Sequence, residues 1–294
     1  CTWTNNVFIS SNFKGLTSSH FTNSNKAMKK SHCIVVILLV TSVAANLPKI
    51  DLKDLLGDAT NQIKDDGGKI GAFVITNLGT QYETALKNFI AKSPNCLDNQ
   101  QLPTLEMEDG SLRTTFATTN FEPLDCLKVD MNVIMDTFEK VDRVVYEMIK
   151  SQASLQPIQT LSKIHAHLYQ HQSHKTNGSK AMVPYHMDNG LYLLITPYPG
   201  QGLTFKTSLG IEMNTSNLGL DSLVVLMGRG LTDWLLPDDR RDQFHAVPHA
   251  VQALDQPFRS IMAMMKIAPD QTLVNGISFQ AMFENNFGLC TDSK

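Results

Sequence analysis

The pattern of apolar and polar positions changes near residue 160 of this chain. Before that point, apolar residues recur mainly at the three- and four-residue spacing of amphipathic helices. After it, short apolar runs alternate with turn residues, which is typical of strands. We therefore predict helices in the first part and a sheet of short strands in the second.

In the first part, the pattern predicts a helix over Asp54–Asp66, which ends at a pair of glycines. Gly71–Asn77 is a continuous apolar run that ends in a turn residue, as in a buried strand. Gln81–Lys92 is predicted to be helical and to end before Pro94, because the residue before a proline disfavours the helical conformation.

The next two segments differ sharply in pattern. Residues 93–124 are polar and are interpreted as loop-like. Residues 127–152 carry one apolar stripe at helical spacing and predict a long helix. The stripe consists of Ile134, Phe138, Val141, Val145, Met148 and Ile149.

Six short apolar runs follow, and their close spacing favours a β-sandwich or barrel. They are Met182–His186, Leu191–Thr196, Gly202–Lys206, Ser222–Met227, Ala246–Ala253 and Ile261–Ile267. A histidine-rich stretch precedes them. Its members, His165, His167, His171 and His174, are interpreted as a polar loop because no carboxylate partner lies nearby in the sequence.

Composition limits the possible classes of protein. The chain has 294 residues, 42% of them hydrophobic, which is enough for a sizeable core. The net charge of −3 gives no basic surface for nucleic acid or anionic membranes. We therefore expect no nucleic-acid partner. A small-molecule substrate and a monomer are also expected, but not from the net charge.

The N-terminal region has the pattern of a targeting segment. Residues 28–45 combine two lysines, an apolar run and a small-residue cleavage site, as a secretory signal peptide does. The apolar run is too short to span a bilayer comfortably, so no stable membrane span is expected after cleavage. Residues 1–27 are interpreted as a non-native or untranslated leader. The expected location is the secretory pathway or the extracellular space.

Three cysteines follow the predicted signal peptide: Cys96, Cys126 and Cys290. They lack zinc-finger spacing, and one disulfide can form among them in an oxidising compartment, with the pair left open. Two glycosylation sequons begin at Asn177 and Asn214 and matter only if the chain is secreted.

The strongest chemical signal is the set formed by His186, Asp188 and His249. Residues two apart on a strand point to the same face, so His186 and Asp188 can offer one nitrogen and one oxygen to the same ion. The third ligand must come from a distant segment. His245 and His249 are both candidates, and His249 is favoured because it begins an apolar run. Two histidines and one carboxylate with open positions are the usual ligands of mononuclear non-haem iron.

Arg259 follows the distal histidine by ten positions. A strand, a turn and a second strand would bring it close to the metal. Its planar guanidinium suits a two-point contact with a carboxylate. The sequence therefore predicts a site for a carboxylate-bearing cosubstrate beside the metal.

These residues, with several further segments, resemble the Fe(II)- and 2-oxoglutarate-dependent dioxygenases of the isopenicillin N synthase-like type. Leu47–Leu52 is similar to the LPxIDL segment of that family, and Lys69–Gly79 looks like its GFFxxxNHG segment, with Leu78 in place of the usual histidine. Gly202–Phe205 resembles the GLQV strand. Ser222–Arg229 resembles the LVVNxGD strand and turn, with Arg229 in place of the aspartate.

The resemblance implies a mostly β fold with flanking helices and a double-stranded β-helix, or jelly-roll, core. It implies Fe(II) on His186, Asp188 and His249, 2-oxoglutarate on Arg259, and O2 as oxidant. Tyr169 would be a cosubstrate contact or, equally, a core tyrosine. The family pattern RxS is broken, because Ile261 stands where serine is usual.

The implied domains are an N-terminal region over 46–125, a long helix over 126–158, the jelly-roll over 159–270 and a C-terminal segment over 271–294. The implied activity is hydroxylation or desaturation of a small organic molecule, coupled to decarboxylation of 2-oxoglutarate. Two alternatives stay open: an iron-dependent oxidase that does not use 2-oxoglutarate, and a catalytically silent secreted jelly-roll that binds a ligand.

Overall fold

The computed structural model describes residues 47–57, 71–107, 109–155, 157–170, 181–197, 202–208, 210–253 and 256–286. All of them belong to one compact unit, Ala44–Lys294. The predicted leader and signal peptide, the Asn177 sequon and Cys290 lie outside the described residues. Among the described helices, none is long and apolar enough to cross a membrane.

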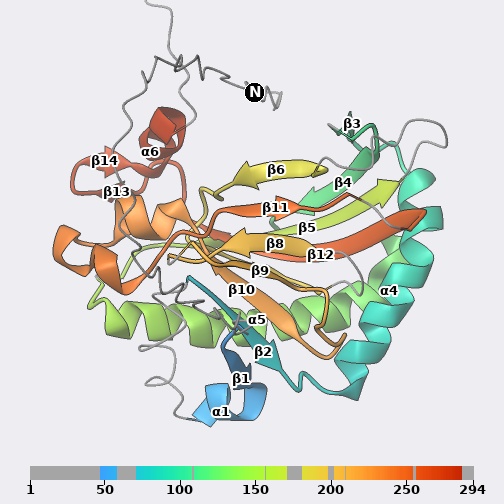
Figure 1. The fold of residues 1–294 in the computed structure, drawn as a ribbon, viewed down its shortest axis with the longest axis horizontal. Helices are drawn as coiled ribbons and strands as arrows, with labels where there is room; N and C mark the ends of the chain where they lie inside the picture. Colours follow the sequence, from blue (N-terminus) through green and yellow to red (C-terminus); the bar gives the residue numbers. More distant parts are fainter. Residues whose placement is uncertain are drawn as a thin grey trace, which may run out of the picture. The chain divides into compact units, whose positions relative to one another are not determined.

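The unit is built on two sheets that face each other (Figure 1). The large sheet has the order β1-β2-β10-β7-β12-β5-β4-β3, and the small sheet has the order β6-β11-β8-β9. Among the described strands of these sheets, β1 and β2 pair in parallel and the other pairs are antiparallel. The expected mostly β fold with a jelly-roll core is confirmed.

The strands have the following bounds. The large sheet contains β1 Lys49–Asp51, β2 Ala72–Thr76, β3 Thr104–Glu106, β4 Leu112–Thr118, β5 Leu161–Gln170, β7 Tyr192–Ile195, β10 Leu223–Met227 and β12 Phe258–Ile267. The small sheet contains β6 Val183–His186, β8 Leu203–Lys206, β9 Glu212–Asn214 and β11 His249–Val251. A separate hairpin consists of β13 Leu273–Val274 and β14 Ile277–Ser278. All six predicted runs after residue 180 contain a strand.

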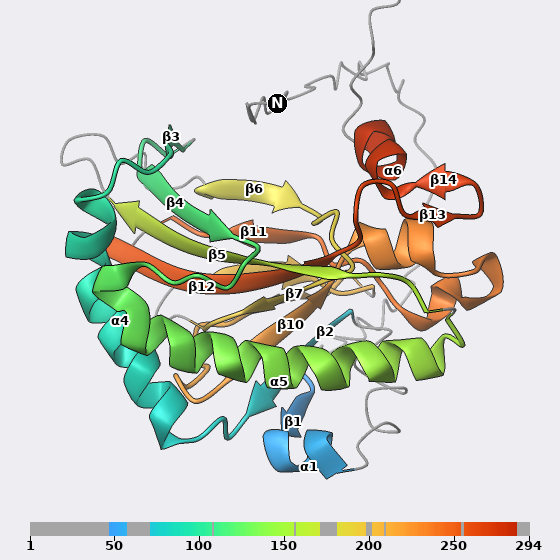
Figure 2. The same cartoon turned by 180° about the vertical axis from the view of Figure 1, so that it is seen from behind.

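Helices cover the face of the large sheet that points away from the small sheet (Figure 2). The helical segments are α1 Leu52–Gly57, α4 Thr80–Asp98, η2 Asp125–Leu127, α5 Lys128–Gln152, η3 Gly230–Leu235, η4 Asp238–Gln243 and α6 Phe279–Asn286. The predicted stripe of α5 is entirely buried in this outer core, against side chains such as Ile164 and Met262. A second core fills the space between the two sheets and includes Tyr169, Phe205 and Ile261.

One buried ion pair joins α5 to the sheet. Lys266 Nζ lies 2.8 Å from Asp142 Oδ2, and the Tyr192 hydroxyl donates to Asp142 Oδ1 at 2.5 Å. Only 10% of the Lys266 side chain and 13% of the Asp142 side chain are exposed. The carboxylate on the helix is therefore satisfied by two side chains from adjacent strands.

Helix α4 corrects one prediction, because it passes through Pro94 and ends at Asp98. A proline lacks the N–H that would bond the carbonyl of Ile90, four residues before it. Here the Ser93 hydroxyl, 3.3 Å away, donates to that carbonyl oxygen. The same hydroxyl is hydrogen-bonded to the Ser260 hydroxyl of β12 at 2.5 Å. A side chain thus replaces the lost backbone donor and also joins the helix to the sheet.

The loop-like interpretation of residues 93–124 was wrong over about half of that range. The segment holds the end of α4 and the strands β3 and β4. The run Thr114–Thr118 is rich in β-branched and aromatic residues, which favour strands, and this was the overlooked signal. A disulfide joins Cys96 to Cys126, with the two Cα atoms 6.0 Å apart, and closes a loop around both strands.

The interpretation of the histidine-rich stretch as a polar loop was wrong for its first two histidines. His165 and His167 lie on β5, which pairs with β12 on one side and β4 on the other. Ile164 and Ala166 face the outer core, so His165 and His167, at the alternate positions of the strand, face the small sheet. His171 and His174 lie outside the described residues. Of the predicted helix 54–66, the structure describes only the part up to Gly57, and that helix begins at Leu52.

Candidate metal centre and its surroundings

The three predicted metal ligands meet where β6 ends and β11 begins. His186 is the last residue of β6, His249 is the first of β11, and the two are cross-strand partners. Their ring centroids lie 4.3 Å apart. Asp188 lies just beyond β6, with Oδ1 3.8 Å from His186 Nε2 and Oδ2 3.6 Å from His249 Nε2. One ligand atom from each residue lies within 4.8 Å of the other two.

Hydrogen bonds to the backbone fix which nitrogen of each ring carries the proton. His186 Nδ1 lies 2.9 Å from Pro184 O, and His249 Nδ1 lies 3.0 Å from Val247 O. A carbonyl oxygen only accepts, so each Nδ1 must be the donor. Each Nε2 then keeps its lone pair free on the side of Asp188. This second contact is the usual way in which a protein orients a metal-binding histidine.

Exposure increases from one side of the centre to the other. The exposed fraction of the side chain is 6% for His249, 17% for Asp188 and 42% for His186. One side of the centre is therefore closed by protein, and the other is open. Two nitrogens and one carboxylate fit a single divalent transition metal and leave coordination positions for other molecules.

Glycines hold the turn that carries Asp188. A Cβ atom added at Gly228 would lie 2.9 Å from Asp188 O, and one added at Gly230 would lie 2.6 Å from Asn189 O. Only glycine allows this approach. Between them, Arg229 donates its backbone N–H to Asp188 O at 2.8 Å. Its side chain binds Asp233 at 2.7 Å. Arg229, the departure from the family pattern, therefore still supports the Asp188 turn through its backbone.

The alternative third ligand, His245, does not belong to the cluster of metal-ligating groups found among the described residues. It lies in the segment before β11, and burial lowers the pKa of its ring. The preference for His249 over His245 thus agrees with the geometry.

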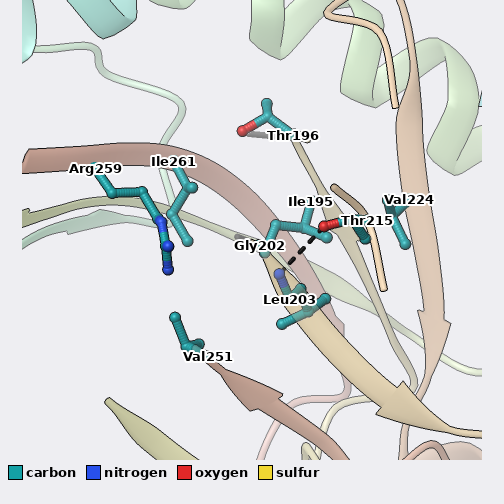
Figure 3. Close-up of a pocket in the computed structure, with 9 residues that line it drawn as sticks. All are labelled: Ile195, Thr196, Gly202, Leu203, Thr215, Val224, Val251, Arg259 and Ile261. Carbon is teal, nitrogen blue, oxygen red and sulfur yellow. Dashed lines mark hydrogen bonds between the residues drawn. The ribbon is translucent and has the colours of Figure 1, made fainter. Parts of the chain in front are cut away.

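Arg259 lies on β12 and is almost completely buried, with an exposed fraction of 2%. Its Nη1 donates to Gln252 O at 2.9 Å and its Nη2 to Ala253 O at 3.5 Å. Figure 3 shows the guanidinium beside a cavity between the sheets. The residues that line it are Ile195, Thr196, Gly202, Leu203, Thr215, Val224, Val251, Arg259 and Ile261.

The strand places the two residues after Arg259 as the alternation predicts. Ile261 lines the cavity on the same side as Arg259 (Figure 3). Ser260 points the other way, toward α4, where it binds Ser93. The position of the usual serine is therefore apolar, and Ser260 does not substitute for it.

Tyr169 lies on β5, directly across from Arg259 on β12 and from Arg113 on β4. Its exposed fraction is 3%, and burial raises the pKa of its hydroxyl, which Arg113 hydrogen-bonds. It packs in the core between the sheets and also lies beside the predicted cosubstrate residue. Its role as a cosubstrate contact stays a prediction.

The sequence did not predict a polar patch on the inner face of the large sheet. It consists of Arg113, Thr115, His165, His167 and Tyr169. The Thr115 hydroxyl and His167 Nδ1 lie 2.9 Å apart. The charge of Asp188 acts on His165 and on Tyr169, so the patch borders the metal centre. Alternation of apolar and polar residues along β5 was the signal that could have found the three members of the patch on that strand.

Neither a family model nor a curated protein sequence matches the chain. Solved structures do match in fold. A dioxygenase for auxin oxidation from rice aligns with a TM-score of 0.57 at 14% identity, over 82% of this chain and 95% of the other. A full-length Neurospora crassa protein solved with alpha-KG gives 0.57 at 16% identity, over 81% and 90%. JOX2, solved with 2OG, Fe and JA, gives 0.57 at 12% identity, over 81% and 80%. The chain therefore has the fold of the Fe(II)- and 2-oxoglutarate-dependent dioxygenases.

Proposed function

We propose that the chain is a mononuclear non-haem iron oxygenase that couples decarboxylation of 2-oxoglutarate to oxidation of a small organic substrate. The observation that carries the proposal is the approach of His186 Nε2, His249 Nε2 and the Asp188 carboxylate within 4.8 Å. The structural relatives add support, since one was solved with alpha-KG and another with 2OG and Fe.

His186, Asp188 and His249 would hold the iron, and Arg259 would bind the far carboxylate of 2-oxoglutarate. Bound iron and 2-oxoglutarate supply the oxidising power to attack a carbon–hydrogen bond with O2. The protein provides orientation and exclusion of water. The backbone contacts of the two Nδ1 atoms keep the ligands aligned before any ion arrives. The buried side at His249 keeps water away, and the open side at His186 admits the substrate.

The test is turnover of the purified chain with Fe(II), ascorbate and 2-oxoglutarate. We expect succinate formation, and we expect iron binding and succinate to be lost in His186→Ala. The matched control is His245→Ala, which removes a histidine outside the cluster and should keep iron. Undiminished turnover in His186→Ala would refute the proposal. Oxygen uptake without succinate would indicate an iron oxidase that does not use 2-oxoglutarate.

We also propose that the chain works in the secretory pathway or outside the cell. The Cys96–Cys126 disulfide supports this, because such bonds persist mainly in oxidising compartments. Asn214, which begins a sequon, is exposed and would be accessible for glycosylation. Mass spectrometry of the chain secreted from eukaryotic cells tests the proposal: residue 28 retained at the start of the product, or a chain retained in the cytosol, would contradict it.

A further inference from the structure

Arg113 is a cation inside the jelly-roll for which the described part of the chain offers no carboxylate partner. The ion pairs among the described residues do not include it. Its Nε atom is buried and has no hydrogen-bond partner there. Within the described part of the chain, Arg113 hydrogen-bonds the Tyr169 hydroxyl, which is neutral because burial raises its pKa. A partly buried charge loses hydration without gaining an opposite charge, so an arginine in this position favours binding of an anion.

The residues around Arg113 also suit an anion. His165 Nε2 is buried and has no hydrogen-bond partner among the described residues. Burial, followed by the charge of Lys163, lowers the pKa of His165 to about 4, so the ring is neutral near pH 7. A neutral ring can present an N–H to an acceptor. The patch therefore combines one cation with neutral donors and contains no acidic side chain.

The patch around Arg113, on the face of the large sheet that points toward the small sheet, is open to solvent. Ala117 is the cross-strand partner of His165, so the two side chains point to the same side of the sheet. Ala117 is exposed, and Arg113, Thr115 and His165 are each half-buried. The patch lies near the candidate metal centre, because the charge of Asp188 acts on His165. A small molecule held here would be presented to the open side of the metal centre.

We propose that Arg113, assisted by the Tyr169 hydroxyl and His165 Nε2, binds the carboxylate of a small organic acid beside the metal. The inference rests on the proposed function, since it concerns the molecule that the oxygenase would act on. The carboxylate can belong to the organic substrate or to 2-oxoglutarate, because Tyr169 lies between Arg113 and Arg259. The experiment separates these two sources.

The first arm measures binding of two acids and their uncharged amides, benzoate against benzamide and hexanoate against hexanamide, by ligand-observed NMR on the full chain. We expect the acids to bind more tightly, and this preference to fall roughly 10- to 100-fold in Arg113→Met, as for the loss of a charge-assisted hydrogen bond. The second arm measures 2-oxoglutarate binding to Mn(II)-loaded protein by calorimetry. If Arg113→Met weakens binding in this second arm alone, the carboxylate that Arg113 binds belongs to 2-oxoglutarate.

The matched control is Arg143→Met, which removes one positive charge from the exposed side of α5 and should change neither arm. Arg113→Met should unfold at the same temperature as the wild type or higher, because it removes a charge that lacks a partner. Unchanged binding in both arms overturns the proposal. Loss of folding in both Arg113→Met and Arg113→Gln also overturns it, since Arg113 would then be a structural residue. The first arm needs neither iron nor turnover, so it remains decisive if succinate is never formed.

Discussion

Acidification should destabilise the fold through His165, and the effect can be calculated. The ring is neutral in the folded chain, where burial lowers its pKa from 6.5 to about 4. In the unfolded chain it takes up a proton near pH 6.5, so the unfolded state binds more protons at acidic pH. The contribution of His165 to stability is therefore complete above pH 6.5 and is lost as the pH falls toward 4.

With these two pKa values, His165 alone lowers the free energy of unfolding by about 2 kcal/mol between about pH 7.5 and about pH 5. Urea unfolding at both pH values measures the change. The chelator EDTA should be present, so that release of a metal from the His–Asp–His centre does not contribute. The variant His165→Gln keeps a neutral polar side chain that does not titrate in this range.

We expect the loss of stability on acidification to be smaller in His165→Gln than in the wild type by about this amount. An NMR titration of the imidazole signals provides a direct check, since His165 should remain neutral until about pH 4. Equal losses in the two proteins, or a ring that titrates near pH 6.5, would show that His165 is not desolvated as its position on the inner face of β5 requires.

Three further predictions concern the rest of the fold and the metal. Lys266→Met leaves Asp142 buried without its cation and should lower the free energy of unfolding in urea by about 3–5 kcal/mol. Most of this stability should return in the double variant that also carries Asp142→Leu. An equal loss in the single and the double variant would contradict this. Ser93→Ala removes the hydroxyl that binds Ile90 O and should cost about 1–2 kcal/mol, whereas an unchanged midpoint would mean that this contact adds nothing. Mn(II) at about 100 times its dissociation constant should stabilise the wild type by about 2.7 kcal/mol and leave His249→Ala unchanged, as read from thermal unfolding.

The sequence was sufficient to predict that the three candidate metal ligands lie together, because most of their geometry is local. His186 and Asp188 are two positions apart, and this spacing alone puts them together at the end of a strand. His249 needed only a second apolar run in the correct order. Six of the strands after residue 180 were predictable for the same reason, since each lies in a short apolar run bounded by turns, whereas β9, β13 and β14 were not predicted.

The features that the sequence did not reveal depend on partners far along the chain. Helix α4 passes through Pro94 because Ser93 supplies a donor and meets Ser260, 167 residues later. Arg113 and His165 belong to one patch only because β4 pairs with β5, and no local pattern encodes that register. His165, a polar residue on a strand, was therefore interpreted as part of a loop.

The disulfide has a consequence for the strand that carries Arg113. Cys96 and Cys126 are separated by 30 positions, and β3 and β4 lie within the loop they close. Closing a loop of this length lowers the chain entropy of the unfolded state by an amount worth roughly 3–4 kcal/mol. Among the described strands, the outer partner of β4 is the three-residue strand β3, so few backbone hydrogen bonds hold it there. The redox state of this disulfide thereby sets how firmly the edge of the sheet with β3 and β4 is held. A reducing environment would loosen β4, which carries Arg113, before it affects the strands that carry His186 and His249.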